Sequence, residues 1–127
     1  MTTELLFEGI GLKNDKVSIV QKALNTLDGY DFLGAVKYFL SKTGYGTDGG
    51  GCDFPGDLDE YEIERDYGGK PFEGVRCYYL GGYEEEEVIV SEKEFFSILK
   101  IACQRYIKLH PEKREELEQI MSKSTLI

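Results

Sequence analysis

The sequence has no tryptophan, only three prolines and a single histidine among its 127 residues. Its three cysteines, Cys52, Cys77 and Cys103, are an odd number, lie far apart and form no CxxC pair. A common zinc site needs four Cys or His ligands at short spacings, and Cys–His catalysis needs a histidine close to a thiol. We therefore expect no metal, no cofactor and mostly structural thiols that stay reduced.

Basic residues are also scarce, since 15 Lys and Arg stand against 24 Asp and Glu, which gives a formal charge of -9. Nucleic acids and anionic membranes are bound through clustered Lys and Arg, so direct binding to either is not expected. No apolar run is long enough to span a membrane, and residues 1–15 lack the features of a signal peptide. We expect a cytoplasmic protein.

Residues that can form a core are present, because 41% of the chain is hydrophobic and it contains nine Tyr and seven Phe. A chain of this size can bury roughly 65% of its extended surface around one core. We expect residues 1–127 to form a single domain, and the protein to be a monomer.

Two segments of the N-terminal third have apolar residues at helical spacing. The first follows Asp15, which can cap a helix, and is stopped by Gly29. The second covers about residues 31–43, and Gly44 follows it where a left-handed C-terminal cap is expected. Residues 5–10 are expected to add a strand.

The C-terminal third predicts two more helices. Ser91 and Glu94 have the spacing of a capping box, in which each side chain accepts a hydrogen bond from the backbone amide of the other. One apolar stripe then continues to His110, and Pro111 suits the first position of a last helix. Residues 122–127 are expected to fray.

In the middle of the chain the pattern changes to a period of two. Acidic side chains alternate with others over residues 60–67, which is typical of a strand. Four carboxylates would share one face of that strand: Glu60, Glu62, Glu64 and Asp66. Residues 73–90 predict a hairpin, and the glycine-rich segment 43–57 predicts an irregular loop. Helices at both ends around a small antiparallel sheet make an α+β fold.

The glycine-rich segment and the carboxylates Asp53, Asp57, Asp59 and Glu60 resemble two kinds of ligand site without meeting their requirements. Residues 44–49 match G-x-G-x-x-G, but a helix precedes them where a strand is needed, and Asp48 would repel phosphate. Counting from Asp57, position 6 of a calcium loop would be Glu62, where glycine is required. An enzyme that uses Cys52 or the loop carboxylates is a further alternative, and it predicts loss of function on one alanine substitution.

Negative charge is concentrated in one region: residues 48–94 hold 15 acidic and 4 basic side chains, net -11, and the rest of the chain holds 9 and 11. Tyrosines, which are enriched in protein interfaces, lie among these carboxylates, and a negative field speeds encounter with a basic partner. A solvated face that prevents aggregation is the alternative. The candidate partner-binding residues are Asp57, Asp59, Glu60, Tyr61, Glu62, Glu64, Asp66, Tyr67, Tyr83, Glu84, Glu85, Glu86 and Glu87.

Four blocks of the sequence are distinctive in their order. They are GYGTDGGGCDFP at 44–55, PFEGV at 71–75, VIVSE at 88–92 and ACQRY at 102–106. In these blocks, over about residues 30–120, the chain resembles ribonuclease-toxin immunity proteins of bacterial contact-dependent growth inhibition systems. The resemblance implies a non-enzymatic protein that binds the C-terminal nuclease domain of a cognate toxin at about one to one.

This resemblance supplies no fixed set of toxin contacts, so the candidate residues come from the charge pattern alone. We expect the matched blocks to form the scaffold, with Phe54, Phe72, Phe95 and Tyr106 in or near the core. The acidic surface would then dock on a basic ribonuclease domain and exclude RNA. The alternative is a general acidic interaction module that binds another basic protein and has no link to a toxin.

Overall fold

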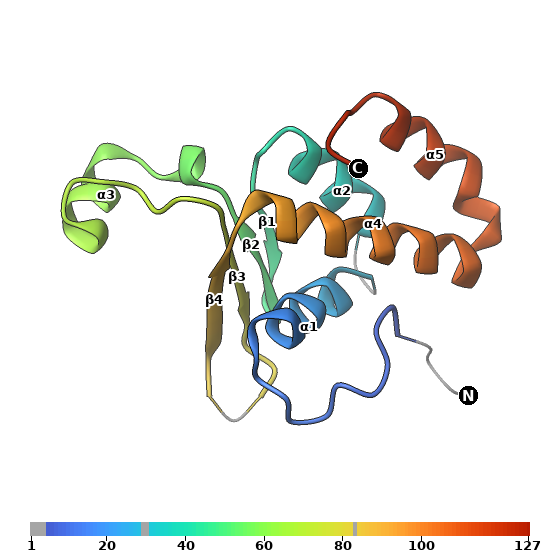
Figure 1. Ribbon diagram of the computed structural model, residues 1–127, viewed down its shortest axis with the longest axis horizontal. Coiled ribbons are helices and arrows are strands. Elements are labelled where there is room, and N and C mark those ends of the chain that lie inside the picture. The colour runs from blue at the N-terminus through green and yellow to red at the C-terminus, as the bar shows by residue number, and fades with distance from the viewer. Residues whose placement is uncertain (1–4, 29–30, 83) are drawn as a thin grey trace.

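A computed structural model describes residues 5–28, 31–82 and 84–127, and within them it confirms the predicted α+β fold (Figure 1). The helices are α1 (Lys16–Asp28), α2 (Phe32–Leu40), α3 (Glu60–Tyr67), α4 (Glu92–Leu109) and α5 (Arg114–Ser122). The strands are β1 (Tyr45–Thr47), β2 (Gly50–Asp53), β3 (Val75–Tyr79) and β4 (Glu86–Val90). Short 3-10 turns cover Pro55–Asp57 and Pro111–Lys113.

The strands form one antiparallel sheet in the order β1-β2-β3-β4. The predicted hairpin at 73–90 is confirmed as β3 and β4, with Val75 opposite Val90. The predicted irregular loop at 43–57 is wrong, since most of it forms the β1–β2 hairpin. Glycine is a poor strand residue, but here the backbone of β2 pairs with strands on both sides, and these hydrogen bonds outweigh that tendency.

One side of the sheet is covered by helices. Figure 1 shows α1, α2, α4 and α5 gathered together, while α3 stands apart from them at the end of an arm. Along β3, Val75 and Cys77 are buried toward the helices, whereas Arg76 and Tyr78 alternate with them and remain partly exposed. The sheet therefore has a helix-covered face and an outer face.

Aromatic side chains fill the centre of the core. The ring of Phe95 lies 5.4 Å from that of Phe39 and 5.9 Å from that of Phe54, both with edge-to-face geometry. Phe72 and Tyr106 are also buried, so all four predicted core aromatics are confirmed. These contacts join α2, α4 and the segment after β2 into one cluster.

The start of the first helix agrees with its prediction, and the end of the second does not. The Asp15 carboxylate accepts hydrogen bonds from the backbone amide and hydroxyl of Ser18 and so caps α1. Helix α2 ends at Leu40, and its left-handed residue is Lys42, not Gly44. Because the amides of residues 41–43 bond back to carbonyls of the last turn, the helix closes before Gly44 is reached.

The predicted strand at residues 5–10 is wrong. The backbone amide and carbonyl of Phe7 bond to the side chain of Asn25, and Arg105 donates to the carbonyl of Leu6. Side chains of α1 and α4 therefore satisfy backbone groups that a strand would have paired with another strand.

At the C-terminus, the predicted Ser91 capping box is confirmed at the start of α4. Pro111 opens the 3-10 turn that leads into α5, as its position suggested. In the tail that was expected to fray, Leu126 and Ile127 are partly buried against the core.

Candidate protein-binding surface

Residues 54–74, here called the arm, leave the body at the buried Phe54 and carry α3 away from it (Figure 1). The predicted strand at 60–67 is wrong, because α3 is a helix with clear signals at both ends. The Asp59 carboxylate accepts a hydrogen bond from the Glu62 amide at 2.7 Å, and the Glu62 carboxylate accepts one from the Asp59 amide. Gly68 closes the helix in the left-handed conformation with φ of 63°. These local hydrogen bonds outweigh the alternating pattern of charge.

The helix divides the predicted row of four carboxylates. Residues four apart share a face of a helix, so Glu60 and Glu64 lie on one side. Glu62 and Asp66 lie on another side and have partners within the arm. Arg65 donates two hydrogen bonds to Asp66, at 2.7 and 2.8 Å, and this holds the pKa of Asp66 below its ordinary value.

The remaining arm candidates differ in what they contact. The Asp57 carboxylate accepts hydrogen bonds from the amides of Gly44 and Phe54, so it fixes the base of the arm. The ring of Tyr67 packs against Phe72, whereas Tyr61 is 68% exposed. No residue of α3 is buried, and its exposed side chains are therefore accessible to a partner.

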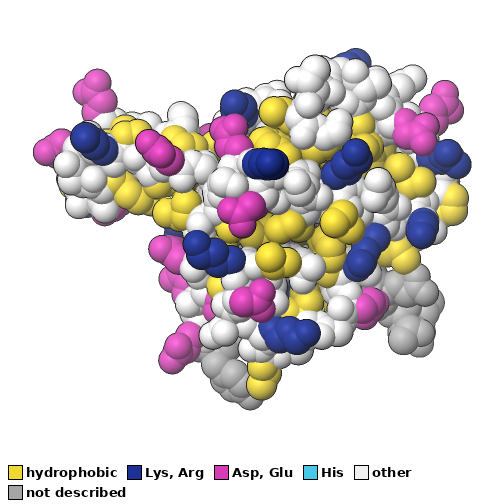
Figure 2. All heavy atoms as spheres, viewed as in Figure 1, with side chains coloured by type: hydrophobic (Ala, Val, Ile, Leu, Met, Phe, Trp, Pro, Cys, Tyr) yellow, Lys and Arg dark blue, Asp and Glu magenta, His cyan; other side chains and the backbone are white. Residues whose placement is uncertain are grey.

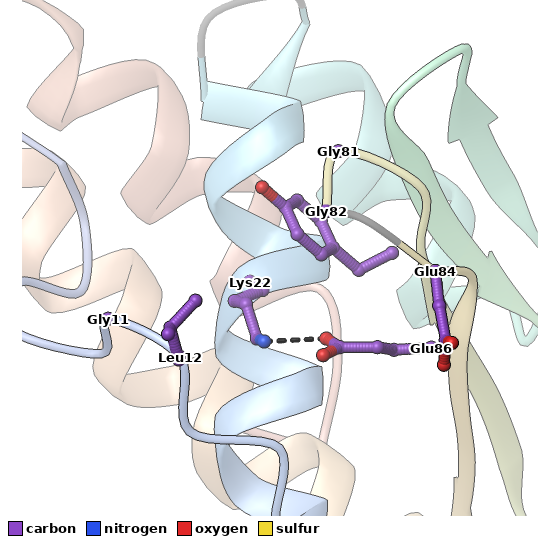
Figure 3. Close-up of a pocket in the computed structure, with 8 residues that line it drawn as sticks. Gly11, Leu12, Lys22, Gly81, Gly82, Glu84 and Glu86 are labelled. Atoms are coloured by element: carbon purple, nitrogen blue, oxygen red, sulfur yellow. Dashed lines mark hydrogen bonds and ion pairs between the residues drawn. The ribbon is translucent and has the colours of Figure 1, made fainter.

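The second group of candidates lies at the β3–β4 turn. Tyr83 is outside the described residues, and Glu84 and Glu85 are exposed. Glu86 is less available to a binding partner, because its carboxylate accepts a hydrogen bond from Lys22 of α1 at 2.5 Å (Figure 3). Both side chains line a surface hollow of about 620 Å³ whose other lining residues include Leu12.

An ion-pair cluster lies on the outer face of the sheet, and the candidate set included its Glu85 and Glu87 but missed Arg76 and Asp53. The Arg76 guanidinium donates to Asp53 at 2.7 Å and to Glu87 at 2.9 Å through Nε, and Glu85 lies 4.0 Å away. Burial raises the pKa of Asp53, while the charge of Arg76 opposes that rise. In the sequence analysis Arg76 entered only as one of the four basic residues of the acidic region.

We use the name outer face for the exposed side of the sheet. Its residues are Gly46, Gly51, Asp53, Arg76, Tyr78, Glu87 and Ile89. Figure 2 shows acidic side chains on the arm and along the adjoining edge of the molecule, with basic and further acidic side chains spread over the rest of this view. The acidic region of the sequence is therefore also an acidic region in space.

The family model for the CDI immunity protein matches residues 16–121, which extend from α1 through the arm to α5. The chain belongs to the CDI immunity protein family. CDI stands for contact-dependent growth inhibition, and membership implies that the protein binds and neutralises a cognate CDI toxin. No curated protein matches the chain significantly.

Proteins of this immunity family are not enzymes, so the alternative of catalysis by Cys52 or by loop carboxylates is excluded. The structure also corrects the place of Cys52, which is buried in β2 opposite Cys77 and not in an irregular loop. Burial is the main reason that the pKa of the Cys52 thiol lies well above its ordinary value. Burial likewise raises the pKa of Cys103 to about 12.

Metal sites and membrane-spanning helices are both missing from the part of the chain that the structure describes. No three His, Cys, Asp or Glu residues gather there as a metal site would require. None of the described helices combines the length and the apolar character needed to cross a bilayer.

His110 lies at the end of α4, with Nε2 3.5 Å from the Asp28 carboxylate and its ring against Tyr106.

Proposed function

We propose that this immunity protein acts in the cytoplasm, where it binds the C-terminal nuclease domain of its cognate CDI toxin at about one to one. The domain is a ribonuclease, and the bound immunity protein covers its RNA-binding surface. One observation carries this proposal: residues 48–94 have a net charge of -11 and supply the arm and all of the outer face except Gly46. A nuclease binds phosphates through Lys and Arg, and the same basic groups attract this acidic surface.

The arm supplies the first contacts in this proposal. Glu60 and Glu64 are exposed on one side of α3, and Tyr61 stands between them in the sequence with most of its ring accessible. Exposed carboxylates steer the encounter with a basic protein, and a tyrosine adds contact area with little loss of side-chain entropy. Asp59 and Glu62 act indirectly, because they hold α3 in its helical form.

The test uses the toxin domain encoded next to the immunity gene. About 150 C-terminal residues of the adjacent large protein should be expressed, and cleavage of RNA and of DNA measured with and without equimolar immunity protein. We expect RNA cleavage, complete inhibition near one to one, and one complex in gel filtration. Cleavage of DNA alone would contradict the ribonuclease assignment. Unchanged RNA cleavage with no complex would contradict neutralisation and favour the general acidic module.

A further inference from the structure

We propose that the outer face of the sheet is the centre of the toxin-binding surface and receives a basic segment of the toxin. The arm and the β3–β4 turn then form its acidic rim. This inference rests on the proposed function and specifies where the toxin docks. It goes beyond the charge pattern, because the central residues are Arg76, Tyr78 and Ile89, and none of these is acidic.

The first observation is that the outer face is accessible. Helix α1 packs against β2, β3 and β4 from the other side of the sheet. On the outer face Ile89 is 38% exposed, and the Glu87 side chain is 52% exposed. An exposed isoleucine beside charged groups matches the centre of a protein interface, where an apolar contact is surrounded by polar residues.

The second observation is that the face is already held in one shape. Tyr78 lies over two glycines, since a Cβ atom at Gly46 would overlap its hydroxyl and one at Gly51 would lie 3.0 Å from it. The Arg76 guanidinium lies 5.0 Å from the Tyr78 ring centre and is also fixed by hydrogen bonds to Asp53 and Glu87. Side chains fixed before binding lose little entropy in the complex.

The third observation concerns the kinds of residue and their charge. Tyrosine and arginine are the residues that most often contribute large binding energies at interfaces. The carboxylates of Asp53, Glu85 and Glu87 surround the single guanidinium of Arg76. The cluster therefore has a net negative charge. Asp53 is the last residue of β2 and directly precedes the arm, so the base of the arm adjoins this cluster. A basic toxin segment is the partner that this charge fits.

The test places opposite charges at the same position of the outer face. Ile89→Lys should raise the dissociation constant for the toxin domain at least about tenfold. Ile89→Glu should leave it within a few-fold of the wild-type value. Ile101→Lys is the matched control, because Ile101 is 44% exposed on α4 and lies outside the proposed surface. Dissociation constants should be measured by calorimetry with the toxin domain, and melting temperatures should confirm that each variant folds.

The outcomes separate this inference from the proposed function. If the wild type binds and inhibits the toxin while Ile89→Lys binds equally well, the outer face is not the centre of the interface. If Ile101→Lys loses binding instead, the toxin docks on the helical side. If the wild type itself forms no complex, both proposals are wrong. Should Ile89→Lys fail to fold, Glu85→Lys is the substitute, since Glu85 is 58% exposed and lies 4.0 Å from the central Arg76.

Discussion

The ammonium group of Lys22 lies 2.5 Å from the carboxylate of Glu86 and thereby joins α1 to β4. Lys22 is buried, and its ammonium group also lies 5.3 Å from the centre of the Tyr79 ring. Loss of one partner leaves the other charge poorly solvated, so Glu86→Gln should lower the free energy of unfolding by about 1–3 kcal/mol. Glu84→Gln, at an exposed position of the same turn, should change it by less than about 0.5 kcal/mol. Urea denaturation measures both, and equal effects would show that the ion pair does not stabilise the fold.

The two capping boxes should differ in their effect on global stability. Ser91 caps α4, which buries Phe95 and Leu99, whereas Asp59 caps α3, which buries no residue. Ser91→Ala should lower the free energy of unfolding by about 1 kcal/mol and the melting temperature by a few degrees. Asp59→Ala should leave the melting temperature nearly unchanged and reduce amide protection over residues 60–67 in hydrogen exchange. A large drop in melting temperature for Asp59→Ala would mean that the arm folds together with the core.

The buried carboxylate of Asp28 should make stability depend on pH. Its Oδ1 has no hydrogen-bond partner in the described structure, and burial raises the pKa of Asp28 above the ordinary value of 3.8 although nearby His110 opposes this. The folded protein therefore binds this proton more tightly than the unfolded chain does. The ionised form lowers stability above the raised pKa, and this penalty disappears as the pH falls through it.

Asp28→Asn should accordingly raise the melting temperature by a few degrees at pH 7–8, and the gain should shrink toward pH 4. Thermal unfolding followed by circular dichroism at several pH values gives the comparison. A wild type that is more stable than Asp28→Asn at pH 7 would show that the contact with His110 outweighs the burial of the carboxylate.

Charge reversal on the arm should slow association with the toxin. In the double variant Glu60→Lys/Glu64→Lys, both changes are on the exposed side of α3 and leave its capping residues intact. We expect a rate constant about tenfold lower at low salt, a weaker salt dependence and little change in melting temperature. Glu115→Lys/Glu116→Lys on α5 makes the same change in net charge and serves as the control. An equal decrease in the association rate constant for both double variants would assign the effect to net charge and not to the arm.

The parts of the fold that could be predicted are those decided by neighbouring residues. The hydroxyl of Ser91 and the amide of Glu94 are three residues apart, so the start of α4 was visible in the sequence. The stretch 60–67 had equally local signals, Asp59 with Glu62 and then Gly68, but the alternating charge was given more weight. Alternation indicates a strand only when one of the two faces is apolar enough to be buried.

The parts that could not be predicted depend on distant residues. Phe7 bonds to Asn25 and Leu6 to Arg105, and without those contacts the pattern of residues 5–10 fits a strand. The acidic candidates show the same limit, because Glu86 and its partner Lys22 are separated by 64 positions. The sequence could indicate that a region was acidic, but not which carboxylates were already paired.

The arm has a consequence for how specificity can change among immunity proteins. Since α3 buries no side chain, substitutions at Glu60, Tyr61 or Glu64 remove no packing from the core and should leave foldability intact. These positions can therefore accept many substitutions during evolution while the caps at Asp59 and Gly68 preserve the helix. Under the proposed docking, recognition of a new toxin evolves at these positions one residue at a time, with no compensating change elsewhere in the protein.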